Sequence, residues 1–170
     1  MKILITGASG QDGILLIDHI FQKSADVTIY ALSRSQQKFS NHLHAIRGLQ
    51  LAETFHQKGH FIICDVTDRA EVMSQLDLIK PDVIFHLAAH MEPLLQPGNE
   101  SQVLSRNMNG LIHILEACDQ LQIFPHIINA GSSLMFGRVD SGIASEKTPF
   151  RPLTPYGLGK VAAHQFAHIF

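Results

Sequence analysis

A glycine-rich turn near the start of the chain restricts the possible folds more than any other feature. Lys2–Thr6 is an apolar segment that predicts a buried strand, and Gly13–Lys23 repeats apolar residues at helical spacing. The turn Thr6–Gly13 joins the two directly, so its glycines stand where a strand passes into a helix. That context gives the spacing a structural meaning that three glycines alone would lack.

The glycines of this turn suit the binding of a dinucleotide. Gly7 permits a tight turn, Gly10 lets the backbone approach a pyrophosphate, and Gly13 allows close packing of the helix on the strand. Free N–H groups and the positive end of the helix dipole would then face the phosphates. The alternative is a plain strand-to-helix turn that needs glycine only for its conformation. We favour the dinucleotide site.

Composition excludes several classes of protein. The 170 residues are 45% hydrophobic and 16% charged, as in one globular domain, and the formal net charge of −2 argues against a nucleic-acid partner. No apolar run approaches the roughly 20 residues of a membrane-spanning helix. The two cysteines, Cys64 and Cys118, are expected to be reduced and buried in a cytoplasmic protein. The eleven histidines are scattered and match no metal-binding motif, so no metal site is expected.

The rest of the chain alternates short apolar runs with longer helical stretches. The expected strands are Val27–Leu32, His60–Cys64, Asp82–Leu87 and His126–Ala130, and the expected helices are Arg69–Ile79, Gln102–Leu121 and one beginning near Tyr156. Ser33–Leu51 is polar with some helical character, Pro93–Ser101 reads as a loop, and Thr67 or Asp68 should cap the helix that follows. This pattern predicts an α/β fold with a Rossmann-like, doubly wound parallel sheet and helices on both faces, formed by residues 1–170 as an NAD(P)-binding domain.

The turn has the spacing TGxxGxxG, which resembles the motif of short-chain dehydrogenases, in particular the extended group of nucleotide-sugar epimerases and dehydratases. Asp65–Asp68, His86–His90 and Asn107–Gly110 resemble later segments of that family in the same order. There they supply an aspartate on the adenine, a small-residue strand end under the cofactor, and a structural asparagine. The resemblance implies the cofactor-binding residues Thr6, Gly7, Gly10, Gln11, Asp12, Gly13, Asp65, Val66, Leu87, Ala88, Ala89, Tyr156 and Lys160.

The end of the second strand bears on the choice of cofactor. An acidic residue there would accept hydrogen bonds from the adenosine ribose and select NAD. Tyr30–Ser35 contains no carboxylate, and Arg34 is suited to a 2′-phosphate, with Ser33 or Ser35 assisting. The alternative is that Arg34 is a solvated surface residue. We expect NADP rather than NAD.

A tyrosine–lysine pair is the candidate for the chemistry. Tyr156 and Lys160 have the spacing YxxxK, so both side chains face the same way on a helix. Tyrosine is a poor base at neutral pH, but a nearby ammonium group and a positive nicotinamide ring favour the phenolate. Ser132, which follows a strand end as in the family pattern, would bind the substrate oxygen. The spacing alone is weak; it gains weight from the glycine turn and Ser132.

Within the extended group, the sequence resembles that of GDP-mannose 4,6-dehydratases at three segments: Gly10–Gly13, Phe136–Gly137 and Glu146–Pro152. Such enzymes oxidise a nucleotide sugar at C4, eliminate water across C5 and C6, and return hydride to C6. The family uses a glutamate two residues after the catalytic Ser/Thr for the elimination, and Leu134 at that position cannot move a proton. A 4-epimerase or 4-reductase needs only the hydride step. A replacement elsewhere in the site is a further alternative.

Members of this family continue for roughly as many residues again beyond the position of Phe170. We therefore expect the C-terminal part, including the substrate domain, to be missing from this chain. The first hypothesis is an NADP-dependent enzyme acting on a GDP- or UDP-linked sugar, and the second is a non-catalytic NADP-binding sensor or scaffold. The resemblance also implies a homodimer or higher homo-oligomer that pairs through the central helix and the Tyr156 helix.

Overall fold

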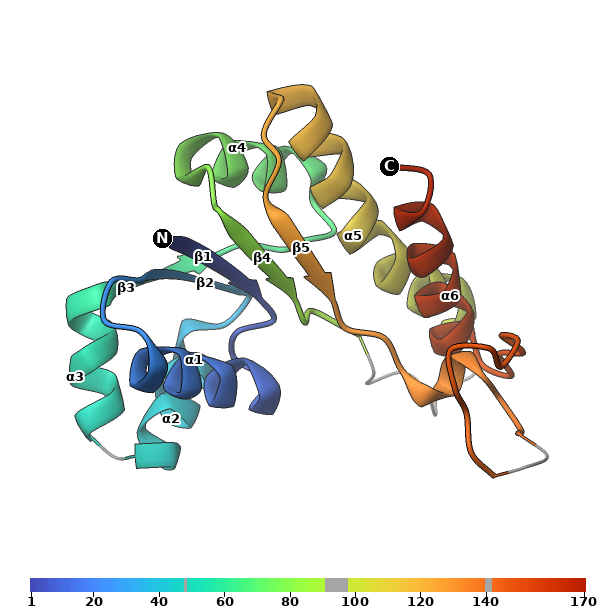
Figure 1. Cartoon of the computed structure of the whole chain (residues 1–170), viewed down its shortest axis with the longest axis horizontal. Coiled ribbons are helices and arrows are strands. Elements are labelled where there is room, and N and C mark those ends of the chain that lie inside the picture. Colours follow the sequence, from blue (N-terminus) through green and yellow to red (C-terminus); the bar gives the residue numbers. More distant parts are fainter. Residues whose placement is uncertain (48, 91–97, 140–141) are drawn as a thin grey trace.

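The computed structural model describes residues 1–47, 49–90, 98–139 and 142–170, and in these the chain forms a five-stranded parallel sheet of order β3-β2-β1-β4-β5 (Figure 1). The strands are β1 Lys2–Thr6, β2 Thr28–Ser33, β3 Gly59–Ile63, β4 Val83–His86 and β5 His126–Asn129. The helices are α1 Gln11–Lys23, α2 Gln36–Arg47, α3 Leu49–Lys58, α4 Arg69–Ile79, α5 Glu100–Leu121 and α6 Pro155–Ala167, with a short 3-10 turn η2 at Ser133–Met135. The Rossmann-like, doubly wound sheet expected from the sequence is confirmed.

The helices cover both faces of the sheet, with α1, α2 and α3 on one face and α4 and α5 on the other (Figure 1). Successive residues of a strand point to opposite faces, and in β1 both directions are apolar. Ile3 and Ile5 join the core under α1–α3, whereas Leu4 joins the core under α4 and α5. Full burial of each such side chain contributes about 1.5–3 kcal/mol. The continuous apolar character of β1 is therefore what requires two helical layers.

The strand register brings the site residues to one edge. Thr6 at the end of β1 is paired with Leu32 in β2 and with His86 in β4, and Ser33 is paired with Ile63 in β3. The last residues of neighbouring parallel strands thus meet at the carboxyl edge of the sheet. Ligands of open α/β sheets bind at this edge, next to the point where the strand order reverses.

Two segments differ from the sequence prediction. Ser33–Leu51 was expected to be only partly helical, but α2 and α3 fill this region and continue to Lys58. Phe39 and Phe55 of these helices are buried and their rings meet at 4.9 Å between centroids, so tertiary packing stabilises helices whose surface is polar. The expected loop Pro93–Ser101 ends earlier, because α5 begins at Glu100; residues 93–97 of that prediction lie outside the described residues.

Other local predictions are confirmed. Of the two candidate caps for α4, Asp68 is the one observed, and its carboxylate accepts hydrogen bonds from the N–H groups of Ala70 and Glu71 at 2.9 and 3.0 Å. Cys64 and Cys118 are both free and buried.

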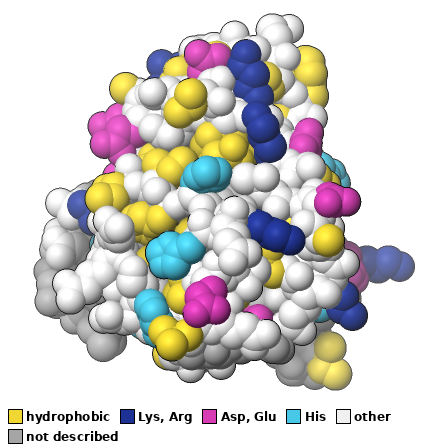
Figure 2. All heavy atoms as spheres, turned by 90° about the vertical axis from the view of Figure 1, so that its left-hand side faces the viewer, with side chains coloured by type: hydrophobic (Ala, Val, Ile, Leu, Met, Phe, Trp, Pro, Cys, Tyr) yellow, Lys and Arg dark blue, Asp and Glu magenta, His cyan; other side chains and the backbone are white. Residues whose placement is uncertain are grey.

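The end of the molecule that carries α3 and β3 has a mixed surface. Figure 2 shows lysines and arginines, acidic residues, histidines and small apolar areas interspersed on this face. Within the described ranges, no helix combines the length and the apolar character needed to cross a bilayer. The same residues contain no group of three or more His, Cys, Asp and Glu side chains arranged to hold a metal ion.

Candidate functional site

The glycine turn brings two backbone segments into direct contact. Gly7 has φ +69°, and a Cβ atom there would lie 2.7 Å from the Ala88 nitrogen just after β4. A Cβ atom on Gly13 would lie 2.7 Å from the Cα of Ala8. Gly7 is therefore needed both for its conformation and for the close approach, and Gly13 is needed for the packing of α1 on the turn.

The first turn of α1 is left open toward this edge. Its N-cap is Gly10, whose N–H donates to the Gly7 carbonyl at 2.9 Å and whose own carbonyl accepts from Ile14 at 3.1 Å. Gly10 has no side chain to accept from the amides of the first turn, and no side-chain cap occurs at this helix end in the described chain. Unsatisfied N–H groups at a helix N-terminus, together with the helix dipole, form a site for an anion such as a phosphate.

Thr6 supports the turn from behind. Its hydroxyl lies 2.8 Å from Nδ1 of His86 and accepts a hydrogen bond from the Ala88 N–H at 3.3 Å. Both Thr6 and His86 are buried. Burial, and then the positive charge of Lys160, lower the pKa of His86 to about 3, so its ring is neutral at physiological pH. This pair ties the end of β1 to the end of β4.

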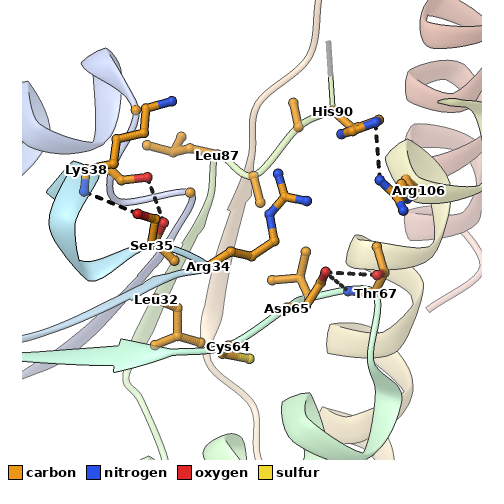
Figure 3. A pocket seen from close by; sticks show the side chains of 17 residues that line it. Leu32, Arg34, Ser35, Lys38, Cys64, Asp65, Thr67, Leu87, His90 and Arg106 are labelled. Carbon is orange, nitrogen blue, oxygen red and sulfur yellow. Dashed lines mark hydrogen bonds between the residues drawn. The ribbon is translucent and has the colours of Figure 1, made fainter. Parts of the chain in front are cut away.

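A cavity of about 440 Å³ opens at the carboxyl edge of the sheet, beside the glycine turn (Figure 3). Many of the expected cofactor residues line it: Gly7, Gly10, Ser33, Arg34, Asp65, Val66, Leu87, Ala88 and Ala89. The cavity wall does not include the other expected residues, namely Thr6, Gln11, Asp12, Gly13, Tyr156 and Lys160, all of which are described. The wall also contains residues that the sequence did not single out as ligand-binding: Ser9, Leu32, Lys38, Cys64, Thr67, His90 and Arg106.

The wall formed by the end of β2 and the start of α2 is basic. Arg34 is exposed and reaches into the cavity, and Lys38 lies in the first turn of α2 and also lines the cavity (Figure 3). The Ser35 hydroxyl accepts from the Lys38 N–H at 3.2 Å. This hydrogen bond caps the start of α2, the helix that carries Lys38. Ser33 points elsewhere, because its buried hydroxyl is 2.6 Å from that of Ser9 in the glycine turn. Of the two serines considered as helpers of Arg34, Ser35 is the one on its side.

Asp65 provides a carboxylate in the cavity wall. Partial burial acts to raise its pKa, but two hydrogen bonds from Thr67 and the charges of Arg34 and Arg106 outweigh that effect and hold the pKa below its usual value. Both bonds reach Oδ1, from the Thr67 N–H at 3.0 Å and from its hydroxyl at 2.8 Å. Asp65 is therefore ionised and oriented as an acceptor.

The wall opposite Arg34 comes from α5. Arg106 donates to Nε2 of His90 at 3.3 Å, and Asn107, the next residue of α5, holds the His90 backbone at both polar groups. The Asn107 side chain accepts from the His90 N–H and donates to its carbonyl, each at 2.9 Å. The expected structural role of Asn107 agrees with these contacts. A basic residue directly before that asparagine was the available sequence signal for Arg106.

Helix α6 carries Tyr156 and Lys160 and places the Lys160 ammonium beside the end of β5. Both residues are buried, and the Lys160 ammonium donates to the carbonyl of Ala130 at 3.0 Å. Burial lowers the pKa of Lys160 below its ordinary value. A Cβ atom on Gly159 would lie 2.8 Å from the Leu104 carbonyl, so α6 packs directly on the backbone of α5.

The segment after β5 lies against the start of α6. A Cβ atom on Gly157 would approach the carbonyl oxygen of Leu134, and the Ala130 carbonyl four residues earlier holds Lys160. Ser132 lies between these two contacts, and its half-buried hydroxyl accepts from the Leu134 N–H at 3.2 Å. Leu134 itself is 37% exposed and has no proton to exchange. Ser132, Tyr156 and Lys160 thus belong to two segments that touch.

The observed cavity fits a dinucleotide. The open amides at Gly10 suit a pyrophosphate, and Arg34 and Asp65 offer a cation and an acceptor further along the wall. Burial raises the pKa of the Cys64 thiol in this wall to about 12, with nearby acidic groups adding to the effect, so this cysteine stays protonated.

Comparison with known proteins agrees with this geometry. The GDP-mannose 4,6 dehydratase family model matches residues 4–170. GDP-mannose 4,6 dehydratase 2 of Arabidopsis thaliana is 32% identical over 96% of this chain and 44% of its own length, and UDP-glucose 4-epimerase of Mycolicibacterium smegmatis is 25% identical over 100% and 51%. The chain thus spans about half the length of these relatives. The structure of WbmG from Bordetella bronchiseptica in complex with NAD has the same fold, with a TM-score of 0.79 and 24% identity over 99% of this chain and 49% of that one.

One family assignment follows from the strand order, the open helix end beside Gly10 and the extent of the family match. The chain belongs to the GDP-mannose 4,6-dehydratase family, within the NAD-dependent epimerase and dehydratase group of short-chain dehydrogenases.

Proposed function

We propose that this chain is the cofactor-binding part of an NADP-dependent enzyme that modifies a nucleotide sugar, GDP- or UDP-linked, by hydride transfer at C4. The observation that carries the proposal is the setting of Lys160: a buried ammonium, held by the Ala130 carbonyl, one helical turn after the buried Tyr156. A buried charge is costly unless it is paired or has a function. The names of two relatives given above, a GDP-mannose dehydratase and a UDP-glucose epimerase, indicate substrates of this class.

The basic wall supports NADP rather than NAD. Arg34 and Lys38 lie on the side of the cavity where β2 ends, with Ser35 between them in sequence, and no carboxylate follows β2 in this stretch. A 2′-phosphate would find a guanidinium, an ammonium and a hydroxyl there. We expect Arg34→Gln to lower NADPH affinity at least tenfold and NADH affinity much less, measured by the fluorescence of the reduced nicotinamide. Equal losses for both cofactors would contradict a 2′-phosphate contact.

In the proposed reaction each residue of the set has one task. Bound NADP supplies the hydride acceptor and, once reduced, the hydride donor. Tyr156 takes the proton of the sugar hydroxyl and returns it in the reverse direction, while Lys160 favours the phenolate by its charge. Ser132 would hold the sugar oxygen by a hydrogen bond. The open first turn of α1 would bind the pyrophosphate and so would position the cofactor.

Leu134 favours a reaction without dehydration. Elimination of water from a sugar requires a group that moves a proton, and the apolar Leu134 stands where the family resemblance places a glutamate. A 4-epimerase or 4-reductase therefore suits this chain better than a 4,6-dehydratase unless another residue replaces the glutamate. The test is incubation of the protein with GDP-mannose or UDP-glucose and NADP, followed by mass analysis. Loss of 18 mass units indicates dehydration, and an unchanged mass with a new retention time indicates epimerisation.

The Tyr156 assignment has its own test. Tyr156→Phe removes one hydroxyl and should abolish turnover while NADPH affinity changes less than about threefold, since the ring remains. Retained activity would overturn the assignment. The second hypothesis, a non-catalytic NADP-binding sensor or scaffold, predicts tight NADPH binding and no turnover of any GDP- or UDP-sugar by the unmodified protein. Self-association through α5 and α6 and a cytoplasmic location remain predictions from the resemblance and from composition.

A further inference from the structure

We propose that Arg106 stacks on the adenine base of the bound dinucleotide, from the wall opposite Arg34 and beside Asp65, the carboxylate that the family resemblance already places on the adenine. This inference rests on the proposed function, because it takes a dinucleotide as the occupant of the cavity. It assigns to α5 a contact with the base, in addition to its packing against the sheet and α6.

Arg106 and Arg34 enter the cavity from opposite walls. Arg34 follows β2 and Arg106 projects from α5, and Figure 3 shows Asp65 lying between them at the floor. Both guanidinium groups act on the same carboxylate, since each contributes to the low pKa of Asp65. The space between the two like-charged guanidinium groups is thus bounded by two planar cations and one acceptor.

Hydrogen bonds orient the side chain of Arg106. Its guanidinium donates to Nε2 of His90 at 3.3 Å, so the histidine accepts and directs the arginine along the wall. The backbone of His90 is in turn held at both its N–H and its carbonyl by Asn107. Asn107 is 4% exposed and also donates to the Val103 carbonyl at 2.8 Å within α5. Three successive contacts thus fix one arginine, and prior ordering lowers the entropy cost of binding.

The chemistry of the three groups identifies the ligand moiety. Guanidinium planes stack on aromatic rings and are attracted to their π faces. Thr67 donates twice to Oδ1 of Asp65, and the remaining lone pairs of this ionised carboxylate are able to accept from a donor on the ligand. A flat aromatic ring carrying an amino group meets both requirements, and adenine is the part of a dinucleotide that has this form.

A contact with the 2′-phosphate is the competing role for Arg106, and the two roles differ in what they predict. Adenine is common to NADH and NADPH, whereas the 2′-phosphate occurs only in NADPH. Loss of a base contact should therefore weaken both cofactors by the same factor. Loss of a 2′-phosphate contact should weaken NADPH alone.

The experiment measures Kd for NADPH and NADH by nicotinamide fluorescence in the unmodified protein and in Arg106→Ala. We expect Kd to rise about tenfold for both cofactors with their ratio unchanged. Arg34→Gln should instead change the ratio. The matched control is Arg69→Ala, which removes an arginine paired at 2.9 Å with Glu116 on the outside of α4 and α5 and should leave both Kd values unchanged.

A second measurement uses the base itself. Deamino-NADPH carries hypoxanthine, which lacks the amino donor, and the unmodified protein should bind it several-fold more weakly than NADPH. A second variant, Arg106→Leu, keeps an apolar surface at the same place. Circular dichroism and urea unfolding check that each variant is folded. A selective loss of NADPH affinity in Arg106→Ala, or no loss for either cofactor, would overturn the inference while leaving the proposed function intact. Absence of any NADPH binding by the unmodified protein would instead overturn the proposed function.

Discussion

Helices α1 and α6 both begin near the carboxyl edge of the sheet, but their first turns are completed in different ways. At α6 the Thr154 hydroxyl accepts from the Gly157 N–H at 3.0 Å, and Pro155 has no N–H that needs a partner. At α1 the N-cap is Gly10, which offers no side chain. One helix end is therefore satisfied by the protein itself, and the other is left for a ligand.

Both regions use glycine to bring backbones together, with different results. Gly7 lets the turn touch the residue after β4, and the amides of α1 remain open beside a cavity. Gly157 lets α6 pack on the carbonyl of Leu134, and Lys160 of the same helix donates to the Ala130 carbonyl just after β5. The comparison separates two forms of a helix N-terminus: an open one offers N–H groups to an anion, and a capped one is satisfied by the protein itself.

The largest effect is expected at the glycine turn. Gly7→Ala should lower the free energy of unfolding by about 3 kcal/mol or more, because the new Cβ meets the Ala88 backbone in addition to the strained φ. Urea unfolding measures this, and NADPH binding should be lost with it. Gly142→Ala is the control, since Gly142 has a similar φ of +71° with no atom within 4 Å of the new Cβ, and should cost about 1 kcal/mol. Equal losses in both variants would show that the contact with Ala88 has no energetic weight.

His86 links the two regions, and its effect depends on pH. Its pKa is about 3 in the folded protein against 6.5 when unfolded, so the unfolded chain binds the proton between these values. Stability from this group is complete above pH 6.5 and is lost as pH falls, by about 2 kcal/mol between pH 7 and pH 5. His86→Asn, whose side chain can still form a hydrogen bond with Thr6, should lack this part of the loss in urea unfolding at the two pH values. His19→Gln, at an exposed position of α1, should keep it.

Giving α1 a cap like that of α6 should weaken cofactor binding. Gly10 has φ −75° and ψ 166°, so a serine fits its backbone conformation, although its Cβ would be 3.2 Å from the Gly7 carbonyl. In Gly10→Ser the hydroxyl would accept from the amides that we assign to the pyrophosphate. We expect Kd for NADPH to rise about tenfold. An unchanged Kd for NADPH would show that the open helix end does not contribute to cofactor binding.

The smallest effect belongs to the capped helix. Thr154→Ala should lower the free energy of unfolding by about 1 kcal/mol, and Thr154→Ser should restore most of it, because the hydroxyl again accepts from Gly157. NADPH affinity should be the same in all three proteins. A drop in NADPH affinity on loss of this cap would mean that the two helix ends do not act independently.

The doubly wound parallel sheet and the glycine turn could be predicted because their causes are local. Continuous apolar runs such as Lys2–Thr6 require cover on both faces, and the turn glycines stand at fixed offsets between a strand and a helix. Asp68 as the cap of α4 followed from the same kind of short-range rule.

The cavity walls could not be predicted in the same way. Arg106 reaches the cavity through contacts with His90, sixteen residues earlier in the chain, and Ser33 is directed to Ser9 across the strand ends. α3 was missed as a separate helix because its stability comes from buried residues such as Phe55 meeting Phe39, rather than from propensity. Side-chain direction at the end of a strand depends on its neighbours in space, which periodicity does not reveal.

The burial of Tyr156 at the N-terminal end of α6 has a practical consequence for spectroscopy. The chain contains no tryptophan and two tyrosines, and the other tyrosine, Tyr30, is in β2 with its ring stacked on His60 at 5.0 Å between centroids. A Tyr30→Phe protein would therefore have a single phenol chromophore, located in the proposed active site. Near-ultraviolet absorbance and circular dichroism of that protein would follow proton loss and ligand arrival at Tyr156 without any introduced label.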